Sequence, residues 1–173
     1  MRLLKQSFDE FRAKYPAREC PPERIENNDQ LKLMAESDGL EYLTDGPGTA
    51  VKSQVPEIEK GDPNIRLWVV RQADVVHALE SVGFGAKLAS GIIKHTNLSG
   101  GEPAHSGGQL VILSENTMAI DGGSGRYGPQ SNQEMTALAK AFTNAGYGVW
   151  SYGYDEESGC PFRIGSKNPE WIA

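Results

Sequence analysis

Residues 109–146 read QLVILSENTMAIDGGSGRYGPQSNQEMTALAKAFTNAG and carry the strongest local structural signals in the chain. Two β-rich runs, 109–113 and 117–121, flank a polar Ser-Glu-Asn, which is the pattern of a β-hairpin. Ser131 and Glu134 then form a capping-box pattern, in which each side chain bonds the other residue's backbone N–H. The stretch therefore predicts a hairpin followed by a helix.

Apolar spacing predicts the remaining elements on either side of this stretch. The helix after Ser131 has one apolar face and a stop at Gly146. Further helices are predicted before Pro16, from the spacing of Leu4, Phe8, Phe11 and Tyr15, and around 31–36. Strands are predicted at 65–71, 91–95, 147–154 and 162–165. These elements predict an α+β fold: an antiparallel sheet with a central hairpin, helices packed on one face, and a helical N-terminal arm.

The segment 44–64, TDGPGTAVKSQVPEIEKGDPN, has many prolines and glycines and few large apolar residues. Such a composition is typical of a surface loop or linker. We therefore expect residues 1–64 to form a helical arm and a long loop, and residues 65–173 to form a compact α+β domain.

Composition and net charge limit the classes of protein to which this chain can belong. The 173 residues are 38% hydrophobic and 23% charged, the net charge is −6 and the isoelectric point is about 5.1. An acidic chain does not coat nucleic acid or an anionic membrane, so we expect no extended nucleic-acid surface. No apolar run approaches the roughly 20 residues that span a bilayer, so no membrane association is expected.

The start of the chain, MRLLKQSFDEFRAKYP, has charges where a signal peptide would need an unbroken apolar stretch. The two cysteines, Cys20 and Cys160, are far apart in sequence, and we interpret them as reduced bystanders. Both observations favour a cytoplasmic location.

Glycines cluster in the middle of the sequence, where 11 of the 20 lie between Gly83 and Gly128. His95 is predicted at a strand end in this region, where it can act as a general acid or base or hold a ribose hydroxyl. Thr96 and Asn97 would donate hydrogen bonds at the same rim. Alternatively, His95 satisfies a buried backbone group while Asn97 caps a turn.

A second candidate segment is Asp121–Pro129, DGGSGRYGP, which lies between a predicted strand and a predicted helix start. Glycine loops in this setting bind phosphate through backbone N–H groups, here around Ser124 and Gly125. Arg126 adds a fork suited to phosphate or carboxylate, and Tyr127 can stack on a base. Alternatively, the loop is a tight turn with Arg126 paired to an acidic residue, Asp121 or Glu102.

Gln109 is a candidate polar contact at the floor of the same pocket, with an ordinary outward-facing strand residue as the alternative. The chain has neither a Walker pattern nor a dinucleotide fingerprint. No cysteine–histidine set has the spacing of zinc ligands, so no metal site is predicted.

The region also resembles a family of uncharacterised bacterial proteins with a His-Thr-Asn-Leu…Gly-Gly…Ser-Gly-Arg-Tyr pattern. It is distantly similar to toxin-like domains and to plant IQ-motif calmodulin-binding proteins. The matching residues are His95, Thr96, Leu98, Gly100, Gly101, Gly107, Gly108, Leu110, Ser124, Gly125, Arg126, Tyr127 and Pro129. Two positions depart from these patterns, since Gln109 replaces a Glu and Arg126 replaces a His. If that Glu is catalytic in the family, the resemblance implies a member that binds without turnover.

A looser similarity links the region to ADP-ribosyltransferase folds, in which a strand-end His and a Tyr contact NAD. It implies that His95 and Asn97 hold the ribose and Tyr127 stacks on nicotinamide, with NAD as a candidate cofactor. Glu134 and Glu156 are the candidates for the acidic residue of such enzymes. Small α+β ribonucleases, in which a His and an Arg flank the scissile phosphate, are a second similarity.

We thus expect a cleft for a phosphate-bearing, nucleotide-like small molecule between 95–109 and 121–131. The catalytic candidates are His95, Arg126 and Tyr127. The ligand-binding candidates are Thr96, Asn97, Gln109, Ser124 and Gly125. The alternative is a non-catalytic acidic interaction module, such as an immunity or antitoxin-like protein, with a protein partner. Whether the chain is an enzyme stays open at this point.

Overall fold

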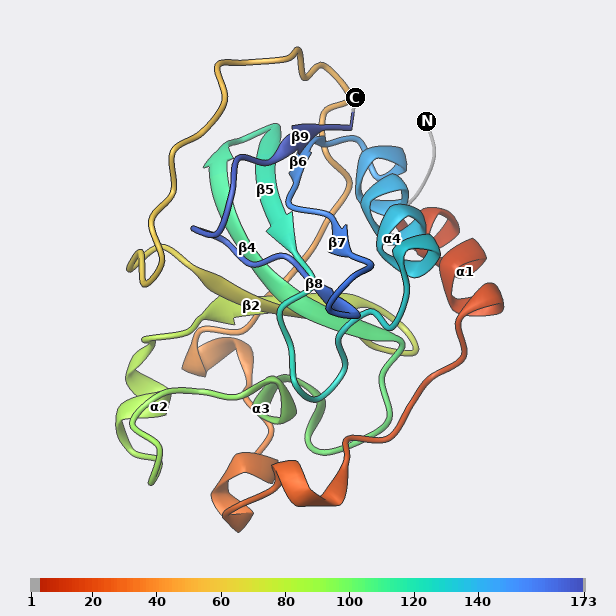
Figure 1. The fold of residues 1–173 in the computed structure, drawn as a ribbon. Coiled ribbons are helices and arrows are strands. Elements are labelled where there is room, and N and C mark those ends of the chain that lie inside the picture. Colours follow the sequence, from red (N-terminus) through yellow and green to blue (C-terminus); the bar gives the residue numbers. More distant parts are fainter. Residues whose placement is uncertain (1–3, 173) are drawn as a thin grey trace.

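The computed structural model describes residues 4–172 (Figure 1). Helices and strands alternate irregularly, and several helices are single 3₁₀ turns, labelled η. In chain order the elements are α1 (Leu4–Lys14), η1 (Pro22–Arg24), η2 (Asn28–Leu31), η3 (Glu36–Asp38), β1 (Glu41–Tyr42), β2 (Arg66–Val70), β3 (Val75–Leu79), α2 (Gly83–Ala86), α3 (His95–Ser99), β4 (Ser106–Ser114), β5 (Thr117–Asp121), α4 (Asn132–Asn144), β6 (Gly148–Ser151), β7 (Tyr154–Asp155), β8 (Cys160–Pro161) and β9 (Glu170–Trp171).

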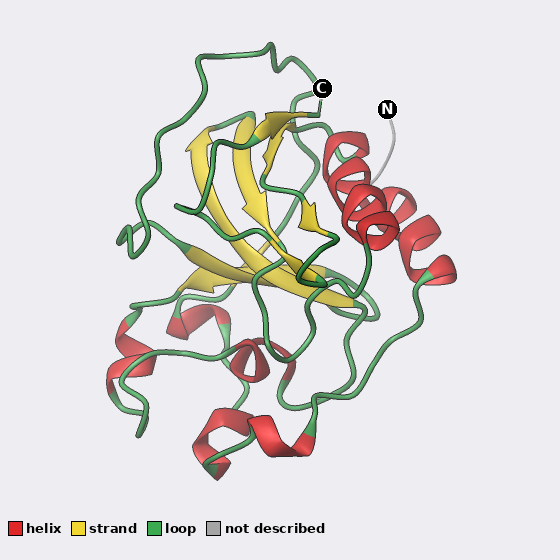
Figure 2. Ribbon diagram, viewed as in Figure 1, coloured by secondary structure: helices red, strands yellow, loops and turns green. Residues whose placement is uncertain are grey.

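One seven-stranded sheet organises the fold, in the order β1-β3-β2-β4-β5-β6-β9. The predicted hairpin, β4–β5, lies near its centre (Figure 2). Neighbouring strands are antiparallel except β5 and β6, which are parallel because α4 connects them as a crossover. A small β7–β8 hairpin lies outside this sheet. The predicted α+β class is confirmed.

The two long helices, α1 and α4, lie side by side on one face of the sheet (Figures 1 and 2). Phe142 of α4 is fully buried and makes edge-on ring contacts with Phe8 of α1, at 5.2 Å, and with Trp68 of β2, at 5.4 Å. Alternate residues of β2 point to this face, since Trp68 and Val70 belong to the same buried cluster. The N-terminal helix is thus part of the core.

The opposite face of the sheet has two coverings. Leu67 and Val69 pack under α3 and the segment before it, in a cluster that includes Leu98 and Tyr127. Farther along the same face, Trp150 packs under residues 160–171, which we call the C-terminal strap. Residues 44–64 run around the outside of the sheet as an extended segment (Figure 1).

The predicted domain boundary after residue 64 stays a prediction. The outermost residues of the two predicted domains, 1–3 and 173, lie outside the described residues. No helix in the described range is long and apolar enough to cross a membrane.

Several predicted elements differ from those observed. The predicted strand 91–95 is wrong, because His95 begins the short helix α3. The reason is a local cap: the Asn97 side-chain oxygen accepts a hydrogen bond from Lys94 N at 2.8 Å, and Gly100 ends the helix with φ +68°.

Two further predictions fail in part. The helix expected around 31–36 is replaced by the 3₁₀ turns η2 and η3, and the first is capped by the Asn27 side chain. The capping box at α4 has only one half, because Glu134 N donates to Ser131 Oγ at 3.0 Å while the Glu134 carboxylate binds Arg18. A long-range ion pair has taken the place of a local bond.

The last two strand predictions also change. The strand expected over 147–154 divides into β6 and β7, and β8 lies at 160–161 rather than over 162–165. Residues 162–165 form part of the strap instead.

Candidate functional site

The two predicted segments, 95–109 and 121–131, fold against each other. Between the segments, Ser99 Oγ lies 2.7 Å from the Tyr127 hydroxyl. Within the first segment, His95 Nε2 lies 2.8 Å from the carbonyl oxygen of Gly108. The approach depends on glycine: a Cβ at Gly108 would collide with the Asp121 carbonyl and the Trp68 ring. Gly108 therefore permits the close contact of its backbone with Asp121 and Trp68.

The predicted catalytic histidine and tyrosine are packed inside this contact. His95 is 6% exposed and Tyr127 is 1% exposed. Burial lowers the pKa of His95 to about 4, so the ring is neutral at pH 7. The Tyr127 hydroxyl donates to the carbonyl of Glu102 at 2.8 Å. The catalytic roles of both residues stay predictions; in this structure their polar atoms bond to the protein itself.

Asn97 and Thr96 are also fully buried. The Asn97 side-chain nitrogen donates to the carbonyls of Asp29 at 3.1 Å and Lys32 at 2.9 Å, so it ties η2 to α3. Thr96 Oγ1 has no hydrogen-bond partner among the residues that the structure describes. Asn97 thus performs the capping role that was the alternative to ligand binding, and it also joins distant segments.

The glycine loop after β5 is held mainly by its own hydrogen bonds. Ser124 Oγ accepts from the backbone N–H groups of Arg126 at 3.2 Å and Tyr127 at 3.0 Å. The Arg126 guanidinium donates to the carbonyl of Arg24 at 2.8 Å rather than to an acidic side chain. A Cβ at Gly125 would lie 3.1 Å from the Arg24 guanidinium carbon, so Gly125 lets that side chain approach.

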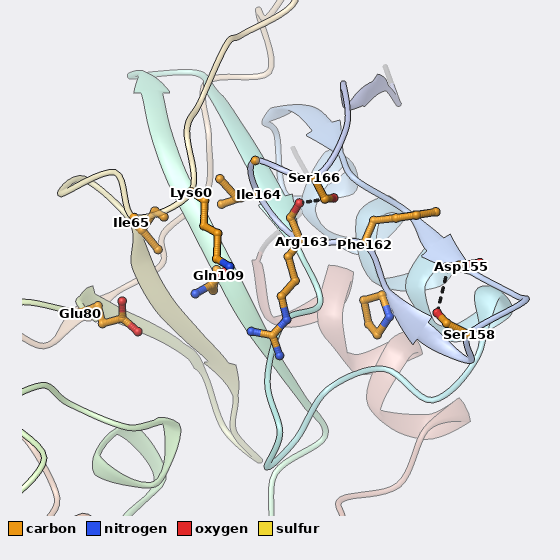
Figure 3. Close-up of a pocket in the computed structure, with 13 residues that line it drawn as sticks. Lys60, Ile65, Glu80, Gln109, Asp155, Ser158, Phe162, Arg163, Ile164 and Ser166 are labelled. Carbon is orange, nitrogen blue, oxygen red and sulfur yellow. Dashed lines mark hydrogen bonds between the residues drawn. The ribbon is translucent and has the colours of Figure 1, made fainter.

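A cleft of about 650 Å³ opens on the same face of the sheet, beyond Gln109 (Figure 3). Its walls come from the end of the 44–64 segment, from the end of β3 and from the C-terminal strap. Gln109 is the one predicted site residue among those that line it. The lining residues used below are Lys60, Ile65, Glu80, Gln109, Phe162, Arg163 and Ile164.

Four charged side chains line the cleft: the cations Lys60 and Arg163 and the carboxylates Glu80 and Asp155. Within residues 4–172, neither the Lys60 ammonium nor the Arg163 guanidinium makes a hydrogen bond or an ion pair, and the Glu80 carboxylate has no partner either. In Figure 3 the Lys60 side chain extends toward Gln109, with Arg163 to the right of Gln109 and Glu80 to the left. The two free cations are the lining groups that can hold an anionic ligand, against the repulsion of the two carboxylates.

Sequence reasoning missed Lys60 and Arg163 because both lie in segments with no repeating pattern. One signal was available: each cation is close to a glycine, in Lys60-Gly61 and Arg163-Ile164-Gly165. Gly165 has φ +90°, and a Cβ there would lie 2.6 Å from Lys60 N. The two loops therefore touch, and this contact brings both cations to one cleft.

Asp121 lies beneath the cleft and is fully buried. Its carboxylate accepts hydrogen bonds from three backbone N–H groups, of Gln109, Gly123 and Ile164. Burial raises the pKa of Asp121 to about 6, against the lowering effect of these bonds and of Arg163.

Within residues 4–172 no group of three or more His, Cys, Asp and Glu side chains is arranged to hold a metal ion. No protein-family model matches the chain, and neither the curated proteins nor the solved structures include a significant match.

Proposed function

We propose that this protein binds a small phosphate-bearing molecule of nucleotide type in the cleft that Lys60 and Arg163 line. One observation carries the proposal: two cations that have no partner within residues 4–172 line a cavity of about 650 Å³ on a chain whose net charge is −6. Pockets of roughly 300–1,000 Å³ are typical of small-molecule sites.

Each lining residue has a role that its chemistry suits. The Arg163 guanidinium can bind two phosphate oxygens at once, and Lys60 adds a mobile point charge. The Gln109 amide can donate to or accept from a polar group next to the phosphate. Ile65, Phe162 and Ile164 offer apolar surface to a sugar or a base.

The proposal moves the anion contact predicted for Arg126 to Arg163. His95 would act indirectly, by bracing the Gly108 carbonyl next to Gln109. NAD stays a candidate ligand, and ADP-ribosyl transfer or RNA cleavage would each require a reactive group beside the bound phosphate. Two carboxylates line the cleft, Glu80 and Asp155. The Asp155 carboxylate already accepts hydrogen bonds from Glu157 N and Ser158 Oγ, so Glu80 is the one available for such a role.

Isothermal titration calorimetry with inorganic phosphate, AMP, ADP-ribose and NAD tests the proposal. We expect saturable binding of at least one of these compounds. Because a hydrogen bond to a charged group contributes about 1.5–3 kcal/mol, Arg163→Ala should weaken binding by about tenfold to hundredfold. Lys87→Ala removes an exposed positive charge that does not line the cleft and should leave the affinity unchanged.

The same titrations distinguish the two arginines. If Arg126→Ala abolishes binding and Arg163→Ala does not, the ligand occupies the glycine loop and the cleft assignment is wrong. If none of the four compounds binds, the proposed function is wrong altogether.

A further inference from the structure

Asp121 connects three segments that meet at the cleft. Its Oδ1 accepts hydrogen bonds from Gln109 N at 3.0 Å and from Gly123 N at 2.8 Å, and its Oδ2 accepts from Ile164 N at 2.8 Å. These donors belong to β4, to the glycine loop and to the C-terminal strap. One buried carboxylate therefore joins the floor of the cleft to its wall.

The floor of the proposed binding site, at Gln109, and its wall, at Arg163, both depend on this carboxylate. The Gln109 side chain lines the cleft directly above its own bonded amide, and Arg163 immediately precedes the bonded Ile164. Arg163 also lies against the glycine loop, since a Cβ at Gly123 would be 3.4 Å from Arg163 Nη1. Asp121 thus fixes the backbone from which the guanidinium extends.

Protonation changes what this carboxyl group can bind. An ionised carboxylate only accepts hydrogen bonds, which matches three N–H donors. A protonated carboxyl carries an O–H donor, so one oxygen loses acceptor strength and faces an N–H with a hydrogen of its own. In the protonated state, the hold on the strap or on the glycine loop weakens.

We propose that Asp121 is a positioning residue for the anion site, and that the cleft holds an anion well only when the Asp121 carboxyl has lost its proton. This inference rests on the proposed function. Burial raises the pKa of Asp121 to about 6, which sets the change in the range between weakly acidic and neutral pH.

Two ionisable side chains act directly on Asp121, Arg163 and Tyr152. Burial raises the pKa of Tyr152, which follows β6, so its hydroxyl stays neutral over this range. From the strap, the Arg163 guanidinium faces Asp121. β4 and the glycine loop face it through the backbone N–H groups of Gln109 and Gly123. His95, bonded to the neighbouring Gly108 carbonyl, has a pKa of about 4 and is neutral as well.

A purely electrostatic effect would have the opposite sign. Protonation of Asp121 removes a negative charge near Arg163, and the whole chain becomes less negative at low pH, so both changes would strengthen anion binding in acid. The proposal expects weaker binding in acid. The direction in which anion affinity changes with pH therefore decides whether Asp121 acts by positioning the site or only through its charge.

Sulfate is a suitable probe because it does not titrate in this range, and its binding can be measured by calorimetry at about pH 5 and about pH 7.5. The wild-type protein should bind sulfate about tenfold more tightly at the higher pH, since about a tenth of Asp121 is ionised one unit below its pKa. Asp121→Asn, whose amide cannot accept three bonds, should bind weakly at both pH values. Arg163→Ala should lose binding at both.

Two outcomes separate this inference from the proposed function. Arg163-dependent sulfate binding that is equal or tighter at about pH 5 overturns the role of Asp121 and leaves the proposed function standing. An absence of saturable sulfate binding at either pH overturns the inference as well as the anion site. If Asp121→Asn does not fold, the backbone amide signal of Ile164 in the wild-type protein provides the test: it should titrate with a midpoint near 6, and a flat response contradicts the proposal.

Discussion

Arg18 and Glu134, which are 116 residues apart in sequence, form an ion pair with a distance of 2.7 Å between Nη1 and Oε1. Glu134 is 3% exposed and also accepts a hydrogen bond from Ser106 Oγ, at 3.3 Å. Arg18 Nη2 donates to the carbonyls of Tyr127 and Gly128. The segment after α1 is thereby fastened to the glycine loop and to the start of α4.

Loss of Arg18 should be severely destabilising. Arg18→Ala leaves a buried carboxylate without its cation, and we expect the free energy of unfolding to fall by about 3–5 kcal/mol in urea denaturation. Asp9→Ala breaks the ion pair between Arg12 and the half-exposed Asp9 and should cost less than about 1 kcal/mol. Equal losses in the two variants would contradict a special role for the buried pair.

Acid should destabilise the protein through its buried histidines. Burial lowers the pKa of both His77 and His95 to about 4, so the unfolded chain binds more protons than the folded one between about 6.5 and 4. This contribution to stability is complete above pH 6.5 and is lost as the pH falls through 4. Asp121, with a pKa raised to about 6, has the opposite dependence: its contribution is complete below 3.8 and is lost as the pH rises through 6.

Two histidines outweigh one aspartate in this balance. At about 1.4 kcal/mol per pKa unit, the free energy of unfolding should be about 3 kcal/mol higher at pH 7 than at pH 4. Urea denaturation at a series of pH values measures this difference. His77→Gln should reduce the pH dependence, and an unchanged slope in that variant would show that His77 titrates normally.

Glu80 should oppose anion binding in the cleft. Its half-buried carboxylate lines the cleft and has no partner within residues 4–172. Glu80→Gln therefore removes a repulsive negative charge and keeps a side chain of similar shape. We expect phosphate affinity measured by calorimetry to rise by about threefold to tenfold at low salt, and less at high salt. Glu115→Gln, at the exposed tip of the hairpin, serves as the control. Weaker binding in Glu80→Gln would show that Glu80 contacts the ligand instead.

Gly108 should not tolerate a larger residue. Gly108→Ala places a Cβ against the Asp121 carbonyl and the Trp68 ring, both in the packed core, and should cost about 2–4 kcal/mol of folding stability. Gly83 has open space where its Cβ would lie, so Gly83→Ala should be neutral or slightly stabilising. Thermal denaturation of both variants measures the two effects.

Local signals explain what could be predicted from sequence. The β4–β5 hairpin and the start of α4 are encoded by residues within a few positions of one another, such as Ser131 and the amide of Glu134. The strand predicted before His95 failed because a single side chain, Asn97, caps a helix there. The ligand pocket predicted from the glycine cluster stays a prediction.

The cleft could not be predicted in the same way. Arg163 and Lys60 meet because Asp121 holds the strap and because Gly165 packs against the backbone of Lys60. These contacts join residues more than forty positions apart, and no periodic pattern marks either segment. The predicted roles of Arg126 and Tyr127 stay untested, although their side chains contact the protein rather than the cleft.

The seven-stranded sheet ends in two-residue strands on both sides, β1 and β9. Because each edge strand is short, it exposes few free backbone donors and acceptors with which a second chain could pair. This should protect the protein against edge-to-edge aggregation. Lengthening either edge strand should conversely expose more unpaired backbone groups and promote aggregation into fibrils.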